Sequence, residues 1–274
     1  MRPLKHGYTN RTLGDGAVVK KTYEGPDAEL RLDRERTLLT RLQGQLPVPP
    51  VHTADADTLT LGFMPGAPGQ ELLDAGHAVE VLEACGKLLR RIHGVSVHDE
   101  GRVLVHGDYG PNNVLLDPVT FQITAVVDWE FAHLGDPVED LAWCEWIVRM
   151  HHPEHRRALD GFFRAYGGDM PPWPARQGAM LARCESLQQF CHRWEPNAPG
   201  VTLWRERAVA TAGWEEWPRK RVSGVDRREP GRPARQVRQR RRRRHMARSG
   251  SMSTMSRTLS PSTRSADSGP RPRV

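Results

Sequence analysis

The chain has 274 residues, of which 38% are hydrophobic and 27% are charged, and its formal net charge is +7. This length allows one large domain or two lobes with a proper core. No apolar run approaches the roughly 18–20 residues that cross a bilayer, which excludes a membrane-spanning protein. The four cysteines form no CxxC pair and no Cys/His cluster suited to zinc, and the N-terminus resembles no export signal. We therefore expect a reduced, soluble, cytoplasmic protein.

The positive charge is concentrated at the C-terminal end. Residues 219–274 contain eighteen Lys or Arg and three acidic residues, a net charge of +15, which leaves −8 for residues 1–218. This segment has no aromatic residue and includes the run "RQVRQRRRRRH", so it buries too little apolar surface to become ordered. We predict a low-complexity, disordered tail. Its origin stays open between a genuine extension and translation of a GC-rich gene in a shifted frame.

The N-terminal segment indicates a small sheet with one helix. The β-branched segment "AVVKKTY" follows a turn at residues 14–16, which predicts a hairpin. Residues 27–43 predict a helix in which Asp27 can cap the first turn. Four leucines fall on roughly one face of that helix: Leu30, Leu38, Leu39 and Leu42. The segment "TLTLGFM" adds a strand, and a Pro- and Gly-rich connection follows it.

Beyond this connection the hydrophobic period becomes helical. Residues 77–94 carry apolar residues at three- and four-residue spacing and end at a glycine. Two short strands, "VLL" and "QITAVVDWE", come next, and the remainder to about Trp217 reads as helices with an aromatic core. We therefore divide the chain into an N-terminal lobe of residues 1–64, a C-terminal lobe of residues 65–218 and the tail.

The loop "VHGDYGPNNVLLD" sets three polar residues, His106, Asp108 and Asn113, at fixed offsets before an apolar strand. Asp128 follows Asp108 by twenty residues, directly after "ITAVV", so a hairpin would open both carboxylates on one cleft. Phosphoryl transfer from a nucleotide needs a base for the acceptor hydroxyl, oxygen ligands for Mg²⁺ and a cation for the phosphates. The loop and Asp128 offer candidates for the first two, and a strand lysine offers the third.

The motif "HGDYGPNN" followed by "VVDWEFAHLGDPVEDLAW" resembles the paired motifs of the aminoglycoside phosphotransferase and choline kinase family. This family is the small-molecule branch of the protein-kinase-like fold. The resemblance implies an α+β, two-lobed protein with a small N-terminal antiparallel sheet plus a helix, and a larger, mainly helical C-terminal lobe. It also implies that Asp108 is the catalytic base, that Asn113 and Asp128 bind Mg²⁺, and that His106 shapes the catalytic loop.

The same resemblance implies roles for charged residues on either side of the loop. Asp136 and Asp140 would be structural acids that buttress the catalytic loop from the next helix. A strand lysine would meet the phosphates, with Glu35 as its partner. Strand alternation lets only one of Lys20 and Lys21 face the cleft, and we favour Lys20.

The nucleotide would meet two further segments. The segment "HGYTNR" is similar to the family's nucleotide-covering loop, which implies that Gly7 and Asn10 approach the phosphates. The segment "LGFMPG" would connect the lobes, with Phe63 and Met64 offering backbone groups to an adenine or guanine. The resemblance covers about residues 4–217, and the tail lies outside it.

The expected activity is transfer of the γ-phosphoryl group of ATP or GTP to a hydroxyl of a small molecule. A net charge of −8 over residues 1–218 suits a cationic acceptor such as an aminoglycoside or amino alcohol, although charge governs steering and does not identify the acceptor. Four acids after the motif could line such a site: Glu139, Glu145, Glu154 and Asp160. A homoserine-like, sugar or cofactor-precursor acceptor stays open.

Three other classes of function stay open. A metal hydrolase could use His106, Asp108, Asp128 and His133, but the motif lies near no HxH or HExxH cluster. A catalytically impaired kinase-like protein could bind nucleotide without turnover. Nucleic acid could bind only through the arginine-rich tail, which lacks a folded recognition module and aromatic residues for base stacking.

Overall fold

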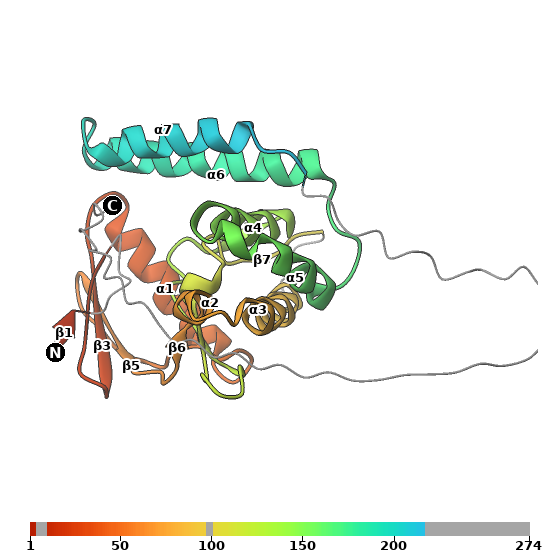
Figure 1. Cartoon of the computed structure of the whole chain (residues 1–274). Helices are drawn as coiled ribbons and strands as arrows, with labels where there is room; N and C mark the ends of the chain where they lie inside the picture. Colours follow the sequence, from red (N-terminus) through yellow and green to blue (C-terminus); the bar gives the residue numbers. More distant parts are fainter. Residues whose placement is uncertain (4–9, 97–100, 217–274) are drawn as a thin grey trace, which may run out of the picture. The chain divides into compact units, whose positions relative to one another are not determined.

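The structure, a computed structural model, describes residues 1–3, 10–96 and 101–216. The described residues belong to one structural unit (Figure 1). Two of the sequence predictions, the phosphate contact of Gly7 and the tail of residues 219–274, lie outside the described residues.

The N-terminal part is an antiparallel sheet of five strands in the order β1-β2-β3-β5-β4, accompanied by helix α1 (Figure 1). The bounds are β1 Arg2–Pro3, β2 Asn10–Gly14, β3 Val18–Tyr23, α1 Ala28–Leu42, β4 Val51–Ala54 and β5 Thr58–Gly62. The predicted hairpin is β2-β3. Its turn forms because Oδ1 of Asp15 accepts the amides of Ala17 and Val18, both at 3.0 Å, while Gly16 adopts a φ of 89°.

Helix α1 differs from the predicted leucine face in two respects. Leu39 and Leu42 are fully buried, but Leu30 is 57% exposed. The buried side of the helix instead includes the charged residues Arg31 and Glu35, because it also faces the polar site described below. Asp27 precedes the helix as predicted but makes no side-chain cap.

Strands and short helices carry the chain into the C-terminal part. Their bounds are β6 Ala67–Pro68, α2 Gly69–Asp74, α3 Ala78–His93, β7 Val103–Val105, η1 Pro111–Asn113, β8 Val114–Leu116, β9 Ile123–Val126 and β10 His133–Gly135. Strands β6, β8 and β9 form one sheet, and β7 pairs with β10. The predicted apolar face of α3 is confirmed, since its six residues are at most 2% exposed: Val81, Leu82, Cys85, Leu88, Leu89 and Ile92.

Helices complete the C-terminal part, as the sequence predicted. They are α4 Val138–His151, η2 Pro153–Ala158, α5 Leu159–Tyr166, α6 Trp173–Trp194 and α7 Pro199–Ala212. Helices α6 and α7 lie side by side (Figure 1). The rings of Trp143 and Trp146 on α4 stack with centroids 4.3 Å apart, and Trp204 of α7 packs on both. In the described part of the chain, no helix has both the length and the apolar character needed to cross a membrane.

Candidate functional site

The loop after β7 is anchored by a buried carboxylate on α4. Asp140 accepts the backbone amides of His106 and Gly107 at 2.7 and 2.9 Å, and it also lies 3.2 Å from Nε2 of His93. Burial raises the pKa of Asp140, but the His93 hydrogen bond and the contacts with His106 outweigh it and lower the pKa. Asp140 therefore has the buttressing contacts that the resemblance implied.

Asp136 does not share this buttressing position. It is exposed, and its Oδ1 accepts the amide of Val138 at 2.8 Å, while Oε1 of Glu139 accepts the amide of Asp136 at 2.9 Å. These two bonds satisfy amides at the start of α4. The prediction that Asp136 supports the catalytic loop is therefore wrong, because its carboxylate is used to cap the helix.

His106 connects the loop to the end of β9. Its Nδ1 accepts the amide of Asp108 at 3.3 Å, so the proton belongs on Nε2, which donates to the carbonyl of Val127 at 3.0 Å. The imidazole is buried against the ring of Trp129, with centroids 4.6 Å apart. Burial lowers the pKa of His106, so the ring is neutral and its contacts are those of a loop-shaping residue.

Both carboxylate oxygens of Asp108 accept hydrogen bonds. Nε1 of Trp143 donates to Oδ1, and Nδ2 of Asn113 donates to Oδ2, each at 2.8 Å. Burial raises the pKa of Asp108 to about 6, against the opposing effects of Arg183, Trp143 and Asn113. A carboxylate with a pKa this close to neutrality is a better proton acceptor than an exposed aspartate and is still ionised at pH 7.

Trp143 is a contact of Asp108 that the sequence did not reveal. The sequence predicts only an aromatic core for this region, yet the indole N–H of Trp143 donates to the carboxylate of Asp108. Trp143 comes three residues after Asp140, so both side chains lie on one face of α4. That helical spacing was the one available signal, because a helix residue placed one turn from the loop-binding acid also faces the loop.

The lysine that faces the site is Lys21. Its Nζ lies 2.6 Å from Oε2 of Glu35 and 2.5 Å from Oδ1 of Asp128. Lys20 is exposed on the opposite face of β3, so the prediction that Lys20 points into the cleft is wrong. Alternation along the strand fixed that only one of the two could face inward, but it did not determine which. Glu35 accordingly partners Lys21.

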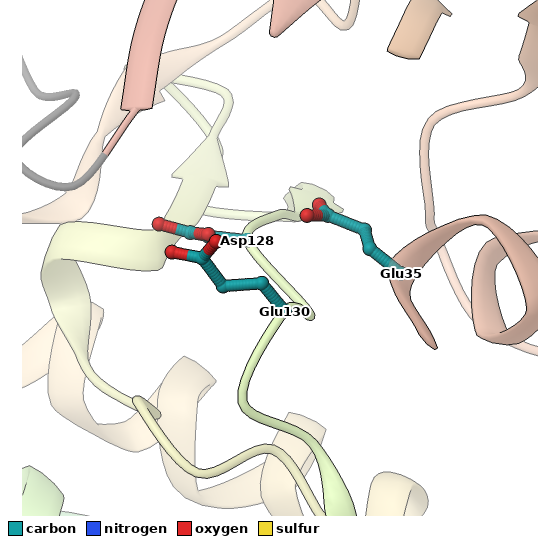
Figure 2. A group of neighbouring side chains, drawn as sticks. All are labelled: Glu35, Asp128 and Glu130. Atoms are coloured by element: carbon teal, nitrogen blue, oxygen red, sulfur yellow. The ribbon is translucent and has the colours of Figure 1, made fainter. Parts of the chain in front are cut away.

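Glu35, Asp128 and Glu130 form a cluster of carboxylates whose ligand atoms lie within 4.8 Å of one another (Figure 2). Glu35 reaches from α1 toward Asp128 and Glu130, which follow β9 (Figure 2). Nζ of Lys21 also lies 3.9 Å from Oε2 of Glu130, so one ammonium group contacts all three carboxylates, and Arg31 additionally pairs with Glu130 at 2.6 Å. Burial lowers the pKa of Lys21, but the three carboxylates raise it well above its usual value. The three carboxylates therefore bind the ammonium group of Lys21.

Asn113 and Asp128 have the donors that Mg²⁺ requires. The carbonyl of Asn113 accepts the amide of Val127 at 3.0 Å, which sets Asn113 beside the segment that carries Asp128. Nδ2 of Asn113 is directed to Asp108, and Lys21 contacts only Oδ1 of Asp128, so Oδ1 of Asn113 and Oδ2 of Asp128 remain as hard oxygen ligands. Asp128 adopts a φ of 69°, a strained conformation that is typical of functional positions.

These side chains line a cavity of about 380 Å³ between the sheet and the segment that carries Asp128. Its walls include Lys21, Glu35, Asn113 and Asp128, together with three other predicted nucleotide contacts: Asn10, Phe63 and Met64. The side chain of Asn10 is buried and donates to Glu130 at 2.7 Å. The amide of Phe63 donates to the carbonyl of Ala17 at 3.0 Å. It is therefore not available for the predicted contact with a nucleotide base.

Two of the four acids predicted to line a cationic acceptor site, Glu139 and Glu145, are engaged elsewhere. Glu145 is buried and hydrogen-bonded to Arg176 and to Arg149, so its charge is neutralised within the core. Glu139 lies 2.8 Å from Nε2 of His133, in addition to its cap of α4. The prediction that Glu145 faces an acceptor is therefore wrong, because its charge is satisfied by two arginines.

Residues 1–102 and 97–179 match the sequence model of a family described as the phosphotransferase enzyme family. Over 55 residues the chain is 46% identical to Hygromycin-B 4-O-kinase of Escherichia coli, and this aligned segment covers 19% of this chain and 16% of that protein. Over 45 residues it is 38% identical to Acyl-CoA dehydrogenase family member 11 of Gallus gallus, and this aligned segment covers 16% of this chain and 6% of that protein. The chain therefore spans only a small part of these curated relatives.

Solved structures share the fold at low sequence identity. The gentamicin complex of APH(2'')-IIa has a TM-score of 0.58 at 13% identity, over 76% of this chain and 90% of that chain. The ADP and hygromycin B complex of an APH(4)-Ia mutant has a TM-score of 0.57 at 18% identity, over 77% and 92%. The GDP complex of aminoglycoside 2'-phosphotransferase-IIIa has a TM-score of 0.59 at 14% identity, over 76% and 91%. The predicted family resemblance and two-part α+β fold are confirmed.

Proposed function

Because the chain belongs to the phosphotransferase enzyme family, we propose that it transfers the γ-phosphoryl group of ATP or GTP to a hydroxyl of a small molecule. The observation that carries the proposal is the setting of Asp108, whose buried carboxylate is held by Trp143 and Asn113. Asn113 also lines the cavity that contains Lys21 and Asp128. A proton acceptor, a phosphate cation and oxygen ligands thus adjoin one another, as phosphoryl transfer requires.

The nucleotide is expected to occupy the cavity, with its base beside Phe63 and Met64 and its phosphates beside Lys21. Glu35 and Asp128 hold the ammonium of Lys21 in place before any ligand binds, so little reorganisation is needed. Asn113 and Asp128 would hold Mg²⁺, which when bound neutralises charge on the phosphates. In this scheme residues 1–64 supply most of the nucleotide site, and residues 65–218 supply the catalytic loop and the acceptor site.

Asp108 acts on the acceptor. Burial raises the pKa of its carboxylate to about 6. Because this pKa is still below 7, the carboxylate is ionised at neutral pH. It orients the acceptor hydroxyl and takes its proton as the oxygen bonds to phosphorus. The hydrogen bonds from Trp143 and Asn113 fix the carboxylate, so the base is positioned before the acceptor arrives.

Release of ADP or GDP tests the proposal. The full chain is incubated with Mg²⁺ and either ATP or GTP, against a panel of aminoglycosides, amino alcohols, sugars and hydroxy acids. The panel includes hygromycin B and gentamicin, because structures with the same fold bind them. We expect acceptor-dependent release with at least one class. Nucleotide binding without release for any acceptor would instead support the catalytically impaired alternative.

Asp108→Asn is the matching variant. We expect kcat to fall by about 10²- to 10⁴-fold, the usual contribution of a general base, while nucleotide affinity is retained. Asp117→Asn is the control, because Asp117 lies on an exposed turn after β8 and accepts hydrogen bonds from Val119 and Thr120. Unchanged turnover in Asp108→Asn would refute the assignment of the base.

A further inference from the structure

Arg183 on α6 is a partly buried cation, two of whose nitrogen atoms are buried without a hydrogen-bond acceptor. Its guanidinium lies over the ring of Phe131, at 4.7 Å from the centroid, and near that of Trp143, at 5.7 Å. The Nε and Nη2 atoms are buried and have no hydrogen-bond partner among the residues that the structure describes. Two aromatic faces thus position the guanidinium while its hydrogen-bond donors stay unused.

This situation is unfavourable for a guanidinium, which normally donates to carboxylates or carbonyls when it is removed from water. Two arginines that are buried as whole residues follow the normal pattern. Arg31 donates to Glu130 at 2.6 Å, and Arg176 donates to Glu145. Burial lowers the pKa of Arg183, and the nearby charge of Asp108 opposes that effect. Two buried nitrogen atoms with unused hydrogen-bond capacity are explained if a ligand supplies the missing acceptor.

The position of Arg183 connects it to Asp108. The indole of Trp143, on which the guanidinium packs, donates to Oδ1 of Asp108. Asn113 occupies the other oxygen, so Arg183 attracts Asp108 electrostatically without sharing a hydrogen bond. On α4, Glu145 is neutralised by Arg176 and does not compensate Arg183. Asp108 therefore compensates the charge of Arg183, but it leaves the Nε and Nη2 donors of the guanidinium without an acceptor.

We propose that Arg183 binds an anionic group of the acceptor, a carboxylate or a phosphate carried on the molecule whose hydroxyl meets Asp108. The proposal rests on the proposed function, since it assigns a substrate class to the same site. A guanidinium presents paired donors that match two oxygens of a carboxylate or phosphate, and such charge-assisted bonds strengthen where water is excluded. The acceptor would then be an anionic alcohol, and the net negative charge of residues 1–218 affects its approach without selecting it.

Matched acceptors test the charge preference. We would compare 3-hydroxybutanoate with its neutral methyl ester, and glycerol 3-phosphate with glycerol, with ethanolamine and gentamicin as cationic acceptors. The first pair tests a carboxylate and the second tests a phosphate. With the full chain, Mg²⁺ and ATP or GTP, we expect at least one anion to exceed its neutral partner in kcat/KM by about 30-fold or more, since a buried charge pair contributes that much.

Arg183→Met and Arg183→Lys assign the preference to this side chain. We expect Arg183→Met to raise KM for the preferred anion about 30-fold, to leave the neutral partner nearly unchanged, and Arg183→Lys to recover part of the affinity. Arg193→Met is the control, because Arg193 is exposed on the same helix and pairs with Asp27 at 2.8 Å. An equal fall in kcat for anionic and neutral acceptors would overturn the proposal and assign Arg183 to the transferred phosphoryl group.

Binding separates this proposal from the proposed function. The affinities of 3-hydroxybutanoate and glycerol 3-phosphate are measured by calorimetry, with the nucleotide site saturated by Mg²⁺ and a non-hydrolysable ATP analogue. Binding that is lost in Arg183→Met supports the anion site even if no acceptor is phosphorylated, and that result would refute only the proposed function. If neither anion binds in an Arg183-dependent manner, or if gentamicin or ethanolamine is preferred, the anion site is refuted while the kinase activity can stand.

Discussion

A buried lysine and a partly buried arginine lie near the two aspartates of the site, and their surroundings are opposite. Lys21 beside Asp128 has two carboxylates within 2.6 Å and a third at 3.9 Å. Arg183 near Asp108 has two aromatic rings and no hydrogen-bond acceptor in the described structure. The surroundings of Asp128 are therefore charge-paired before any ligand binds, whereas Arg183 near Asp108 has hydrogen-bond donors that no described residue accepts. Lys21 is therefore held by ion pairs within the protein, whereas Arg183 keeps the unused donors on which the proposed anion site rests.

Replacing Lys21 is expected to have the largest effect on stability. Lys21→Met removes the ammonium group from Glu35 and Asp128, whereas Glu130 keeps its ion pair with Arg31 at 2.6 Å. Removing one partner of a buried ion pair costs about 3–5 kcal/mol, because the remaining charges stay buried and uncompensated. Urea unfolding measures the loss. Lys20→Met is the matched control, since its exposed side chain should change the free energy of unfolding by no more than about 0.5 kcal/mol. Equal losses would contradict the pairing described for Lys21.

Asp140 supports the loop that carries Asp108, and its replacement is expected to have an intermediate effect. Asp140→Asn replaces one carboxylate oxygen with an NH₂ group, although the amides of His106 and Gly107 need both oxygens. One buried amide then loses its acceptor, which costs about 1–3 kcal/mol.

Unfolding of Asp140→Asn should be measured together with kcat, which is expected to fall because the loop loses an anchor. Asp136→Asn is the control, because that exposed side chain caps α4 and does not contact the catalytic loop. A kcat loss in Asp136→Asn equal to that of Asp140→Asn would contradict the distinction between a loop anchor and a helix cap.

The sequence predicted those parts of the molecule that local pattern determines. The six residues that the hydrophobic period of α3 predicted to be buried are buried, and the spacing of the two motifs predicted Asp108, Asn113 and Asp128 as site residues. Where one sequence pattern was compatible with two arrangements of side chains, the sequence offered no physical reason to prefer either arrangement. Alternation on β3 allowed either lysine to face inward, and only the position of α1 decides for Lys21.

Contacts between residues far apart in the chain are a second kind of feature that the sequence did not predict. Trp143 and Arg183 lie 35 and 75 residues beyond Asp108, and their roles depend on how α4 and α6 pack together. The leucine face of α1 failed for a related reason. Arg31 and Glu35 are buried because partners from other segments satisfy their charges, and a hydrophobicity pattern assigns such residues to solvent.

Replacing Arg183 is expected to have the smallest effect on stability. Arg183→Met removes no hydrogen bond among the described residues, and a methionine can still pack against Phe131 and Trp143. The free energy of unfolding should therefore fall by no more than about 1 kcal/mol, or rise, since an unpaired guanidinium is unfavourable in a core. Arg176→Met on the same helix is the matched comparison, because it removes the donor to Glu145 and should cost about 3–5 kcal/mol. Comparable losses in urea unfolding would mean that Arg183 is bonded within the protein, and the contrast between the two cations would not hold.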